Sequence, residues 1–333
     1  MPNTIKIAIP MAGYGSRMRP QTWSRPKPLL ALAGKTALDY CLAQFDTLPP
    51  RIEREYIFIV GAQGDQVREH MAKHHPEKTV HYVTQLEMRG QSDALYLARE
   101  YLRGPMLMAF SDTLIETDLA FLAAEALDGI AWVKPVPDPR RFGVAEAGAD
   151  GLVTRMIEKP SAMDNNRAVV GFYYFRSGED LMTAIESQFK RKLSLRGEFF
   201  LTDAINVWLE GGRKMRIQQI DTWLDAGIPE TLLETNGYYL AHGAANEPHI
   251  SEGTVIPPVF IHPNARIESA VIGPYVSIGA NCHIKDAVIR NSILDEDCQV
   301  QNAVLKDTLL GKRVRLEGKA IHTHLGDDAW QIQ

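Results

Sequence analysis

Short runs of β-branched and other apolar residues alternate, over the first 130 residues, with segments whose apolar residues recur at helical spacing. The runs predict strands and the amphipathic segments predict helices between them. Strands separated by such helices indicate βαβ units around a mostly parallel sheet, an α/β fold in which ligands bind beyond the carboxyl ends of the strands. The expected strands are 5–9, 56–60, 80–83 and 106–110, and the expected helices are 36–48, 65–74 and 92–102.

The middle of the chain, from about residue 130 to residue 240, has a more mixed pattern of apolar and polar positions. It fits a second lobe built on the same sheet. The expected strands are 131–134, 153–157, 169–175 and 215–220, and the expected helices are 180–190 and 203–210.

The composition changes at residues 242–258, HGAANEPHISEGTVIPP, which are rich in Gly, Pro and small polar residues and indicate a connection between domains. Beyond it, aliphatic residues, often followed by Gly, recur about every six positions, as hexapeptide repeats do. Such repeats stack as coils of a parallel β-helix, and 258–320 has room for a few coils. We therefore expect a Rossmann-like α/β domain at 1–245 and a short left-handed parallel β-helix at 246–333. The repeat is marked by Ile267, Ile272, Ile278 and Ile284.

The composition narrows the class of protein. Of the 333 residues, 45% are apolar and 23% are charged, as in soluble globular proteins. The net charge of -5 argues against a nucleic-acid or anionic-membrane partner, because either needs a basic face. No stretch approaches the ~20 apolar residues of a membrane span, so we expect a cytoplasmic protein. The three cysteines lack metal-ligand spacing, which disfavours a zinc site built on them.

The first expected strand runs into PMAGYGSRMRPQTWSRPKPLL, residues 10–30. Gly13 and Gly15 permit backbone geometry that lets amide groups approach phosphate oxygens, although a tight turn alone would also use glycine here. Arg17 and Lys27 add positive charge, as a forked and as a mobile phosphate ligand respectively. The stretch matches neither GxxxxGK[ST] nor GxGxxG, so P-loop ATPases and dinucleotide-binding proteins lose their main support.

The run GYGSR followed by PKPLL resembles the GxGTR and PKP signature of the sugar-1-phosphate nucleotidylyltransferases, and the resemblance continues over most of the first 240 residues. These enzymes join a sugar phosphate to a nucleoside triphosphate and release pyrophosphate. The resemblance implies that Arg17 contacts the β- and γ-phosphates and that Lys27 stabilises charge during transfer. It also implies that Ala12 and Gly13 lie near the nucleoside; many members have two glycines there, and uridylyltransferases for N-acetylglucosamine phosphate tolerate Ala.

A base-recognition segment is implied by TQLEMRGQSDAL, residues 84–95. In the family a glutamine amide pairs with the base edge beside a glycine backbone, roles that fit Gln85 and Gly90. A glutamine amide offers a donor and an acceptor, which suits the imide edge of a pyrimidine. An exposed glutamine at a strand end is the alternative interpretation.

Two aspartates resemble the magnesium ligands of the family: Asp112 in FSDT and Asp225 in WLDAG. Mg²⁺ prefers oxygen ligands and commonly takes one or two carboxylates together with phosphate oxygens and water. An aspartate in a turn is otherwise most often a cap. The matching motifs favour Asp112 and Asp225 as a Mg²⁺ pair.

The sugar phosphate is expected to contact several separate segments, RFGVAE, IEKP and RGEFFLTDAI among them. The resemblance implies that glycine backbones and Glu158 contact the sugar, while Lys159 and Arg196 hold its phosphate. Taken singly, Glu158 with Lys159 would be a surface ion pair and Arg196 part of a helix start. Val170 and Ile228 depart from the residues usual in the family, which leaves the sugar open. The expected sugar-phosphate residues are Gly143, Glu158, Lys159, Gly171 and Arg196.

The expected reaction is an in-line attack of the sugar phosphate on the α-phosphorus, with Mg²⁺ and positive side chains offsetting the charge and no covalent enzyme intermediate. The motifs favour dTTP or UTP with glucose 1-phosphate, while ATP, GTP and other sugars stay open. Similar enzymes are often dimers or tetramers, so a homo-oligomer is possible.

Two rival functions stay open. Hexapeptide coils also carry acyltransferases, for which His262, His283, His322 or His324 would supply a base. A non-catalytic sensor of nucleotides or sugar phosphates could keep the fold without turnover.

Overall fold

The computed structural model describes residues 4–246, 248, 250 and 252–318. The chain forms two compact units, Met1–Leu30 with Lys35–Leu232, and Ala31–Gly34 with Leu233–Gln333. The division between them falls inside helix α6 (Pro229–Tyr239). Strand β14 (Gly253–Val255) already lies within the stretch that the composition marks as a connection, so that stretch is not wholly a linker.

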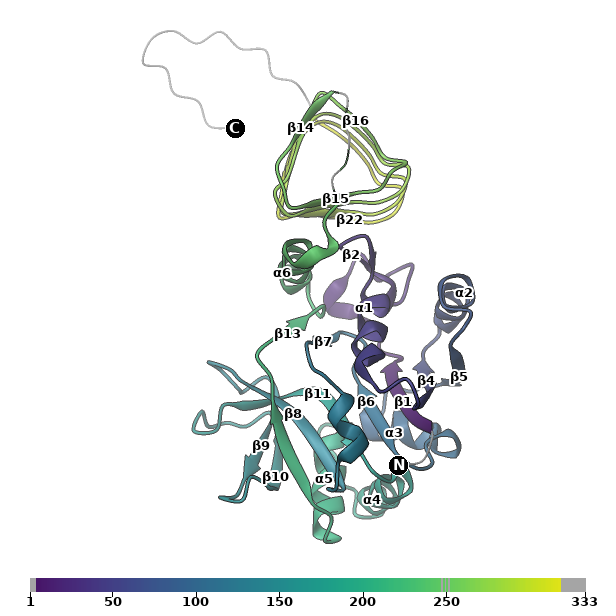
Figure 1. The fold of residues 1–333 in the computed structure, drawn as a ribbon, viewed down its shortest axis with the longest axis vertical. Helices are drawn as coiled ribbons and strands as arrows, with labels where there is room; N and C mark the ends of the chain where they lie inside the picture. The colour runs from purple at the N-terminus through teal and green to yellow at the C-terminus, as the bar shows by residue number, and fades with distance from the viewer. Residues whose placement is uncertain (1–3, 247, 249, 251, 319–333) are drawn as a thin grey trace. The chain divides into compact units, whose positions relative to one another are not determined.

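One half of the sheet in the first unit is parallel, as the alternation of strands and helices predicts (Figure 1). In register, Ile7 lies opposite Tyr56 and Leu107. In spatial order these strands are β6 (Met106–Ala109), β1 (Thr4–Met11), β4 (Glu53–Val60) and β5 (Thr79–Thr84). The three inner strands β6, β1 and β4 are mostly buried, which is typical of a parallel sheet, whereas the edge strand β5 is partly exposed.

The other half of the sheet is mainly antiparallel. Strand β11 (Arg167–Phe175) runs antiparallel to β6 and continues the sheet into the second lobe. The unit is therefore a mixed α/β sheet, and every strand expected from the sequence is present. The remaining strands are β8 (Gly129–Pro135), β9 (Gly143–Ala147), β10 (Val153–Glu158) and β12 (Met215–Gln219).

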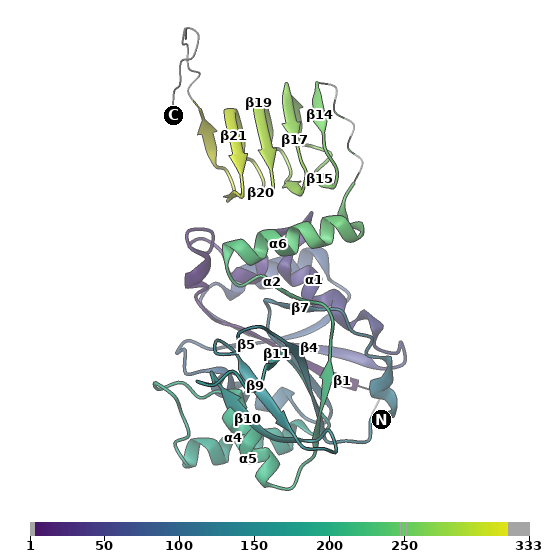
Figure 2. The ribbon, with the colours of Figure 1, turned by 90° about the vertical axis from the view of Figure 1, so that its left-hand side faces the viewer.

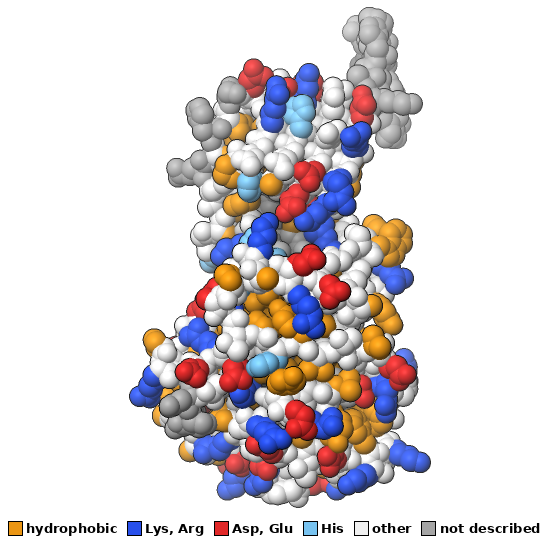
Figure 3. Space-filling view, turned by 90° about the vertical axis from the view of Figure 1, so that its right-hand side faces the viewer, with side chains coloured by type: hydrophobic (Ala, Val, Ile, Leu, Met, Phe, Trp, Pro, Cys, Tyr) orange, Lys and Arg blue, Asp and Glu red, His pale blue; other side chains and the backbone are white. Residues whose placement is uncertain are grey.

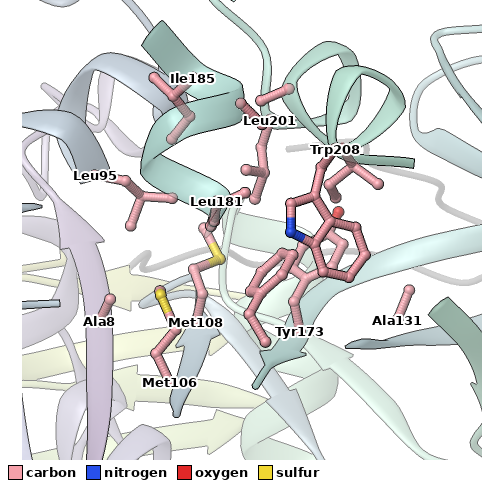
Figure 4. Close-up of a cluster of buried hydrophobic side chains, with 14 of the residues drawn as sticks. Ala8, Leu95, Met106, Met108, Ala131, Tyr173, Leu181, Ile185, Leu201 and Trp208 are labelled. Atoms are coloured by element: carbon pink, nitrogen blue, oxygen red, sulfur yellow. The ribbon is translucent and has the colours of Figure 1, made fainter. Parts of the chain in front are cut away.

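Three helices cover one face of this sheet. Their side chains interdigitate with those of β6 and β11, as Leu181, Met108 and Tyr173 do in the close-up of the core (Figure 4). Helix α4 begins because the Ser177 hydroxyl accepts a hydrogen bond from the amide of Asp180, an N-cap arrangement. The helices are α3 (Gln91–Leu97), α4 (Gly178–Lys190) and α5 (Leu201–Glu210).

Helix α1 (Ala37–Ala43) and the 3-10 helix η3 (Gln44–Thr47) together fill the range expected as one helix. Phe45 packs on Tyr56 and Phe172, with ring centroids 6.1 and 5.6 Å apart. Alternate side chains of β4 thus face opposite layers, Tyr56 toward Phe45 and Ile57 toward the core of α3 to α5. The other elements are α2 (Gly64–His74), η1 (Ser16–Met18), η2 (Lys27–Leu29), β3 (Lys35–Thr36), η4 (Arg99–Tyr101), β7 (Thr113–Ile115), η5 (Ala120–Ala124) and β13 (Trp223–Asp225).

The second unit is built from short parallel strands, several of which lie side by side in Figure 2. Each strand pairs with the one 16 or 17 positions further on: Ile267 lies opposite Ile284, which lies opposite Val300. These aliphatic side chains are buried, as are Ile272 and Ile278. The elements are β2 (Ala31–Leu32), η6 (Leu240–Ala244), β15 (Val259–Ile261), β16 (Arg266–Glu268), β17 (Ala270–Ile272), β18 (Val276–Ile278), β19 (His283–Arg290), β20 (Ser292–Leu294), β21 (Gln299–Lys306), β22 (Leu309–Leu310) and β23 (Arg315–Glu317).

Corners between these strands recur with the same spacing. Asn281, Asp297 and Arg313 have positive φ values of 58°, 62° and 61°. The amide of Asn281 donates a hydrogen bond of 3.2 Å to the carboxylate of Asp297 in the next layer. Asn and Asp tolerate the left-handed region better than most residues do, so these corners suit the backbone they occupy. Within the described ranges, no helix is both long and apolar enough to span a membrane.

Candidate functional site

A cavity of about 470 Å³ lies at the carboxyl ends of β1 and β6 in the first unit. This is the edge at which parallel sheets bind ligands. Its wall is formed by the loop after β1, the segment after β5 and the turn after β6. The sequence-predicted residues that line it are Ala12, Gly13, Gly15, Arg17, Lys27, Gln85, Gly90 and Asp112.

Gly15 forms the tight turn of the glycine-rich loop. Its φ of 59° lies in the left-handed region, and an added Cβ would come within 3.0 Å of Thr22 Cγ2. The Thr22 hydroxyl and the Met18 amide both donate to the Gly15 carbonyl over 2.8 Å. The turn thus starts η1 and leaves Arg17 exposed at the cavity, where a guanidinium is free to meet an anion.

Lys27 and Asp112 form an ion pair between Nζ and Oδ2 inside the cavity. Lys27 begins η2 and Asp112 lies in the turn between β6 and β7, so the pair joins two segments that are 85 positions apart. Their side chains are only 13% and 25% exposed. The ion pair therefore lies where solvent screening is reduced.

Asp225 is brought beside Asp112 by the pairing of β13 with β7, in which Asp225 lies opposite Thr113. The amide of Ala226 donates to the carbonyl of Asp112 over 3.1 Å. Burial raises the pKa of Asp225, and the negative charge of Asp112 raises it further, while Lys27 opposes the shift. The strand pairing thus brings two acidic groups from distant segments close enough to affect each other's ionisation.

The Asp225 carboxylate is itself held in place. Its Oδ1 accepts from the Gly227 amide over 2.8 Å, and its Oδ2 accepts from the Thr231 hydroxyl over 3.1 Å. Asp225 does not line the 470 Å³ cavity, whereas Gly227 does. Two carboxylates with oxygen donors only are a ligand set that Mg²⁺ accepts and that softer metals do not favour.

Gln85 is buried next to Gly90. Its Nε2 donates to Asp93 Oδ2 over 2.9 Å and to the Gly90 carbonyl over 3.3 Å. Because both partners are acceptors, the amide group must present its nitrogen to them. Gly90 has a φ of 101°, and an added Cβ would collide with the backbone of Phe199. The position is restricted to glycine on both counts.

Glu158, Gly143 and Thr202 form a separate group beside the cavity lining. The Thr202 hydroxyl donates to Glu158 Oε2 over 3.3 Å, and an added Cβ on Gly143 would lie 3.3 Å from the same oxygen. Burial raises the pKa of Glu158, with Lys159 opposing and Glu198 adding to the rise. Because Glu198 lines the cavity and affects the pKa of Glu158, the Glu158 carboxylate lies near the edge of the cavity.

Three of the expected sugar-phosphate residues take less direct positions. Lys159 is half-exposed, with its ammonium group 4.8 Å from the ring centre of Phe200. Gly171 has a φ of 79°, and its carbonyl accepts from the amide of Phe110, next to the Ser111–Asp112 turn. Arg196 is exposed and is not among the residues that line the cavity.

Some residues at the site were not predicted from the sequence. Glu198 lies in RGEFFLTDAI, the stretch that resembles the sugar-phosphate segment of the family. Only Arg196 of that stretch was expected at the site, and the sequence did not show that Glu198 would line the cavity. Asp93, Thr202 and Thr231 act by holding other side chains, and only the folded chain shows those contacts. Further residues that line the cavity are Met88, Gln91, Ser111 and Glu198.

Residues 8–242 match the protein family described as Nucleotidyl transferase. The chain belongs to this family. Residues 255–328 match a second family, described as the GMPPB C-terminal domain. The nucleotidyl transferase match covers the sheet, the cavity and both aspartates.

Curated relatives of this nucleotidyl transferase family member fall into two groups by length. The Bifunctional protein GlmU of Methanocaldococcus jannaschii is 32% identical over 69% of this chain and 53% of its own length. The chain spans about half the length of such relatives. The low-salt glycan biosynthesis nucleotidyltransferase Agl11 of Haloferax volcanii is 29% identical and covered to 92% in both chains. The glucose-1-phosphate thymidylyltransferase of Streptomyces griseus is 27% identical, with 87% of both covered.

Solved structures share the fold. A putative glucose-1-phosphate thymidylyltransferase from Bacillus anthracis, in complex with a sucrose, superposes with a TM-score of 0.60 at 24% identity. It covers 74% of this chain and 98% of its own. At this identity the likeness supports the α/β fold of the nucleotidyl transferase unit.

Proposed function

We propose that this chain transfers a nucleotidyl group from a nucleoside triphosphate, with dTTP or UTP favoured, to a sugar 1-phosphate, with glucose 1-phosphate favoured. The products are an NDP-sugar and pyrophosphate. The observation that carries the proposal is the convergence of the glycine loop, Lys27 with Asp112, and Gln85 on one cavity. The names of relatives aligned over most of the chain support the same reaction.

The orientation of Gln85 supports a pyrimidine triphosphate. With Nε2 committed to Asp93 and Gly90, Oε1 is the amide atom left to meet a ligand. An oxygen acceptor complements the N3–H of thymine or uracil, whereas adenine and cytosine present a bare ring nitrogen at the corresponding edge. Guanine carries an N–H there, so size and neighbouring contacts would have to distinguish it.

Asp112 and Asp225 are the residues proposed to hold Mg²⁺. The fit rests on two electrostatically coupled carboxylates and on the hydrogen bonds that fix Asp225. When bound, Mg²⁺ would offset the negative charge on the phosphate oxygens. Lys27, which forms an ion pair with Asp112, is proposed to stabilise the charge around the α-phosphate.

Different positive side chains are proposed to bind the pyrophosphate and the sugar phosphate. Arg17 is proposed to bind the departing pyrophosphate, because a guanidinium grips two oxygens at once. Lys159 and Arg196 are proposed to hold the sugar phosphate, with Glu158 accepting from sugar hydroxyls and Gly143 and Gly171 beside the ring. A sugar phosphate is already an anion at neutral pH, so no general base is needed to activate it.

We also propose a domain division at 245/246, after which the chain forms a left-handed β-helix of hexapeptide-type coils that serves assembly. The parallel pairing at 16- or 17-residue intervals supports the coils. For the rival acyltransferase, His262 Nδ1 accepts from the Asn264 amide and His283 Nε2 faces Glu268 over 3.2 Å. His322 and His324 lie outside the described residues.

Pyrophosphate release tests the proposal. The full chain with Mg²⁺ is assayed with dTTP, UTP, GTP and ATP against glucose, mannose, galactose and N-acetylglucosamine 1-phosphates, each with a no-sugar control. Sugar-dependent release supports the reaction and identifies both substrates. Triphosphate binding without turnover on any sugar supports the sensor instead, and acetyl-CoA consumption with a sugar amine supports the acyltransferase.

A further inference from the structure

Asp39 on α1, His70 on α2 and His75 directly after α2 bring three metal-ligating atoms together on the first unit. One ligand atom from each lies within 4.8 Å of the other two. The Nε2 atoms of His70 and His75 lie 2.8 and 2.7 Å from the same oxygen, Oδ1 of Asp39. None of the three residues lines the 470 Å³ cavity, so the cluster is separate from the candidate active site.

The Asp39 carboxylate is fixed in direction before any ion arrives. Its Oδ2 accepts hydrogen bonds of 2.8 Å from both the amide and the hydroxyl of Thr36, as part of the capping box that starts α1. This leaves Oδ1 directed at the two imidazoles. Burial alone would raise the pKa of Asp39, but hydrogen bonds from His70, His75 and Thr36 outweigh it and hold the pKa well below its usual range.

We propose that Asp39, His70 and His75 bind a divalent transition-metal ion of the zinc class, with the remaining coordination position open to solvent. Two imidazole nitrogens and one carboxylate oxygen are the donor types that zinc takes from proteins. A tetrahedral ion with bonds of about 2.1 Å holds its ligands roughly 3.4 Å apart, so the contacts of 2.8 and 2.7 Å open by about 0.6–0.7 Å. Small changes in the side-chain torsion angles of the partly buried histidines are enough for a change of this size.

Metal binding requires the proton of each imidazole to move from Nε2, which donates to Asp39, to Nδ1. Binding through Nε2 places the imidazole proton on Nδ1, which then needs an acceptor. Nδ1 of His75 lies 4.0 Å from Glu77 Oε1, within reach of that role after a small adjustment or through water. The ring of His70 stacks on that of His74, with centroids 4.7 Å apart, which limits its rotation.

The cluster is accessible to solvent yet not freely hydrated. The side chains of Asp39, His70 and His75 are 14%, 13% and 19% exposed. Figure 3 shows the molecule from the side on which α2 lies in Figure 1. An ion bound to the cluster would link α1 to α2. Helix α1 lies a few residues after the segment that carries Lys27. The expected consequence is a more stable first unit with metal bound.

Zinc binding by the full chain tests the site. Chelator-treated protein is titrated with Zn²⁺ by calorimetry, in excess Mg²⁺ so that Asp112 and Asp225 are occupied, and with Co²⁺ by visible absorption. We expect one Zn²⁺ per chain, a raised thermal midpoint, and Co²⁺ bands of a low-coordinate nitrogen and oxygen site. The variant combining His70→Gln and His75→Gln should lose more than about 100-fold in affinity, because two metal ligands are removed.

His81→Gln is the matched control, since His81 stacks on Tyr101 at 4.6 Å and is not part of the cluster. It should bind zinc as the parent does. Equal affinity in the double variant, or a Co²⁺ spectrum of the hydrated ion alone in the parent, would overturn the assignment. Circular dichroism of each variant without metal separates lost ligands from lost folding.

Discussion

The carboxylate of Asp93 accepts a hydrogen bond of 2.9 Å from the side-chain amide of Gln85, eight positions earlier in the chain. Asp93 belongs to the first turn of α3, and Gln85 follows β5. A carboxylate accepts only, so this contact decides which end of the amide faces the cavity. In the proposed function, the preference for a nucleobase therefore depends on a residue that does not line the cavity itself.

Asp93→Asn should weaken that choice, because an asparagine can present either a donor or an acceptor to Gln85. A hydrogen bond to a charged group is worth about 1.5–3 kcal/mol, so kcat/KM for the preferred pyrimidine triphosphate should fall roughly tenfold or more relative to ATP. Asp65→Asn, at a side chain that is 94% exposed on α2, is the control. An unchanged ratio would mean that Gln85 does not read the base.

Asp225→Asn should abolish Mg²⁺-dependent turnover, since it removes one of the two carboxylate charges proposed to hold the ion. We expect a loss of at least about 100-fold in kcat, measured as pyrophosphate release across a Mg²⁺ titration. Asp221→Asn, at an exposed residue just before β13, should behave as the parent does. Parental turnover in Asp225→Asn would remove the metal assignment.

Lys159→Ala should raise the KM for the sugar phosphate while sparing triphosphate binding. The lost charge attracts only the nucleophile, so we expect about a tenfold effect on the sugar side, corresponding to about 1.4 kcal/mol. Initial rates at varied sugar phosphate and triphosphate separate the two constants. Lys190→Ala, at an exposed lysine that ends α4, controls for net charge. Equal effects on both substrates would contradict the assignment.

Gly171→Ala should disturb the turn that carries Asp112. The new methyl group would overlap the ring of Phe110, and φ of 79° is strained for alanine. Gly151→Ala shares the strain, with φ of 77°, but its Cβ would meet nothing within 4 Å. We expect Gly171→Ala to lose about 1–3 kcal/mol more in the free energy of unfolding, and to lose turnover as well. Equal losses in the free energy of unfolding for the two variants would show that the ring of Phe110 moves aside without cost.

Glu158→Gln should change how stability depends on pH. Burial raises the pKa of Glu158 in the folded chain, so its ionised form costs stability above the ordinary glutamate pKa. That cost disappears as the pH falls through the raised folded pKa. The variant should therefore gain stability over the parent at about pH 7.5 and lose that advantage at about pH 4, as measured by urea unfolding. A constant difference would place Glu158 in a solvated setting.

Much of the α/β unit could be predicted from the sequence. Strands such as 5–9 and helices such as 65–74 follow from the spacing of apolar residues along the chain. That spacing identifies each element because helices and strands repeat their side-chain directions at different intervals. Where the ends of a helix differ from the prediction, contacts with distant segments explain the difference. The helix expected over 36–48 becomes a 3-10 helix where Phe45 packs on Tyr56 and Phe172.

The sequence by itself determined the glycine loop, its two positive side chains and the placement of candidate residues at strand ends, because spacing along one segment fixes which groups follow a strand. The family resemblance pairs Asp112 with Asp225, but only the tertiary structure shows how distant groups such as these meet. The pairing of β13 with β7 brings Asp225 to Asp112, and the packing of α1 beside α2 brings Asp39 to His70 and His75. Contacts between segments depend on the fold of the whole unit, and no local pattern in the chain encodes them.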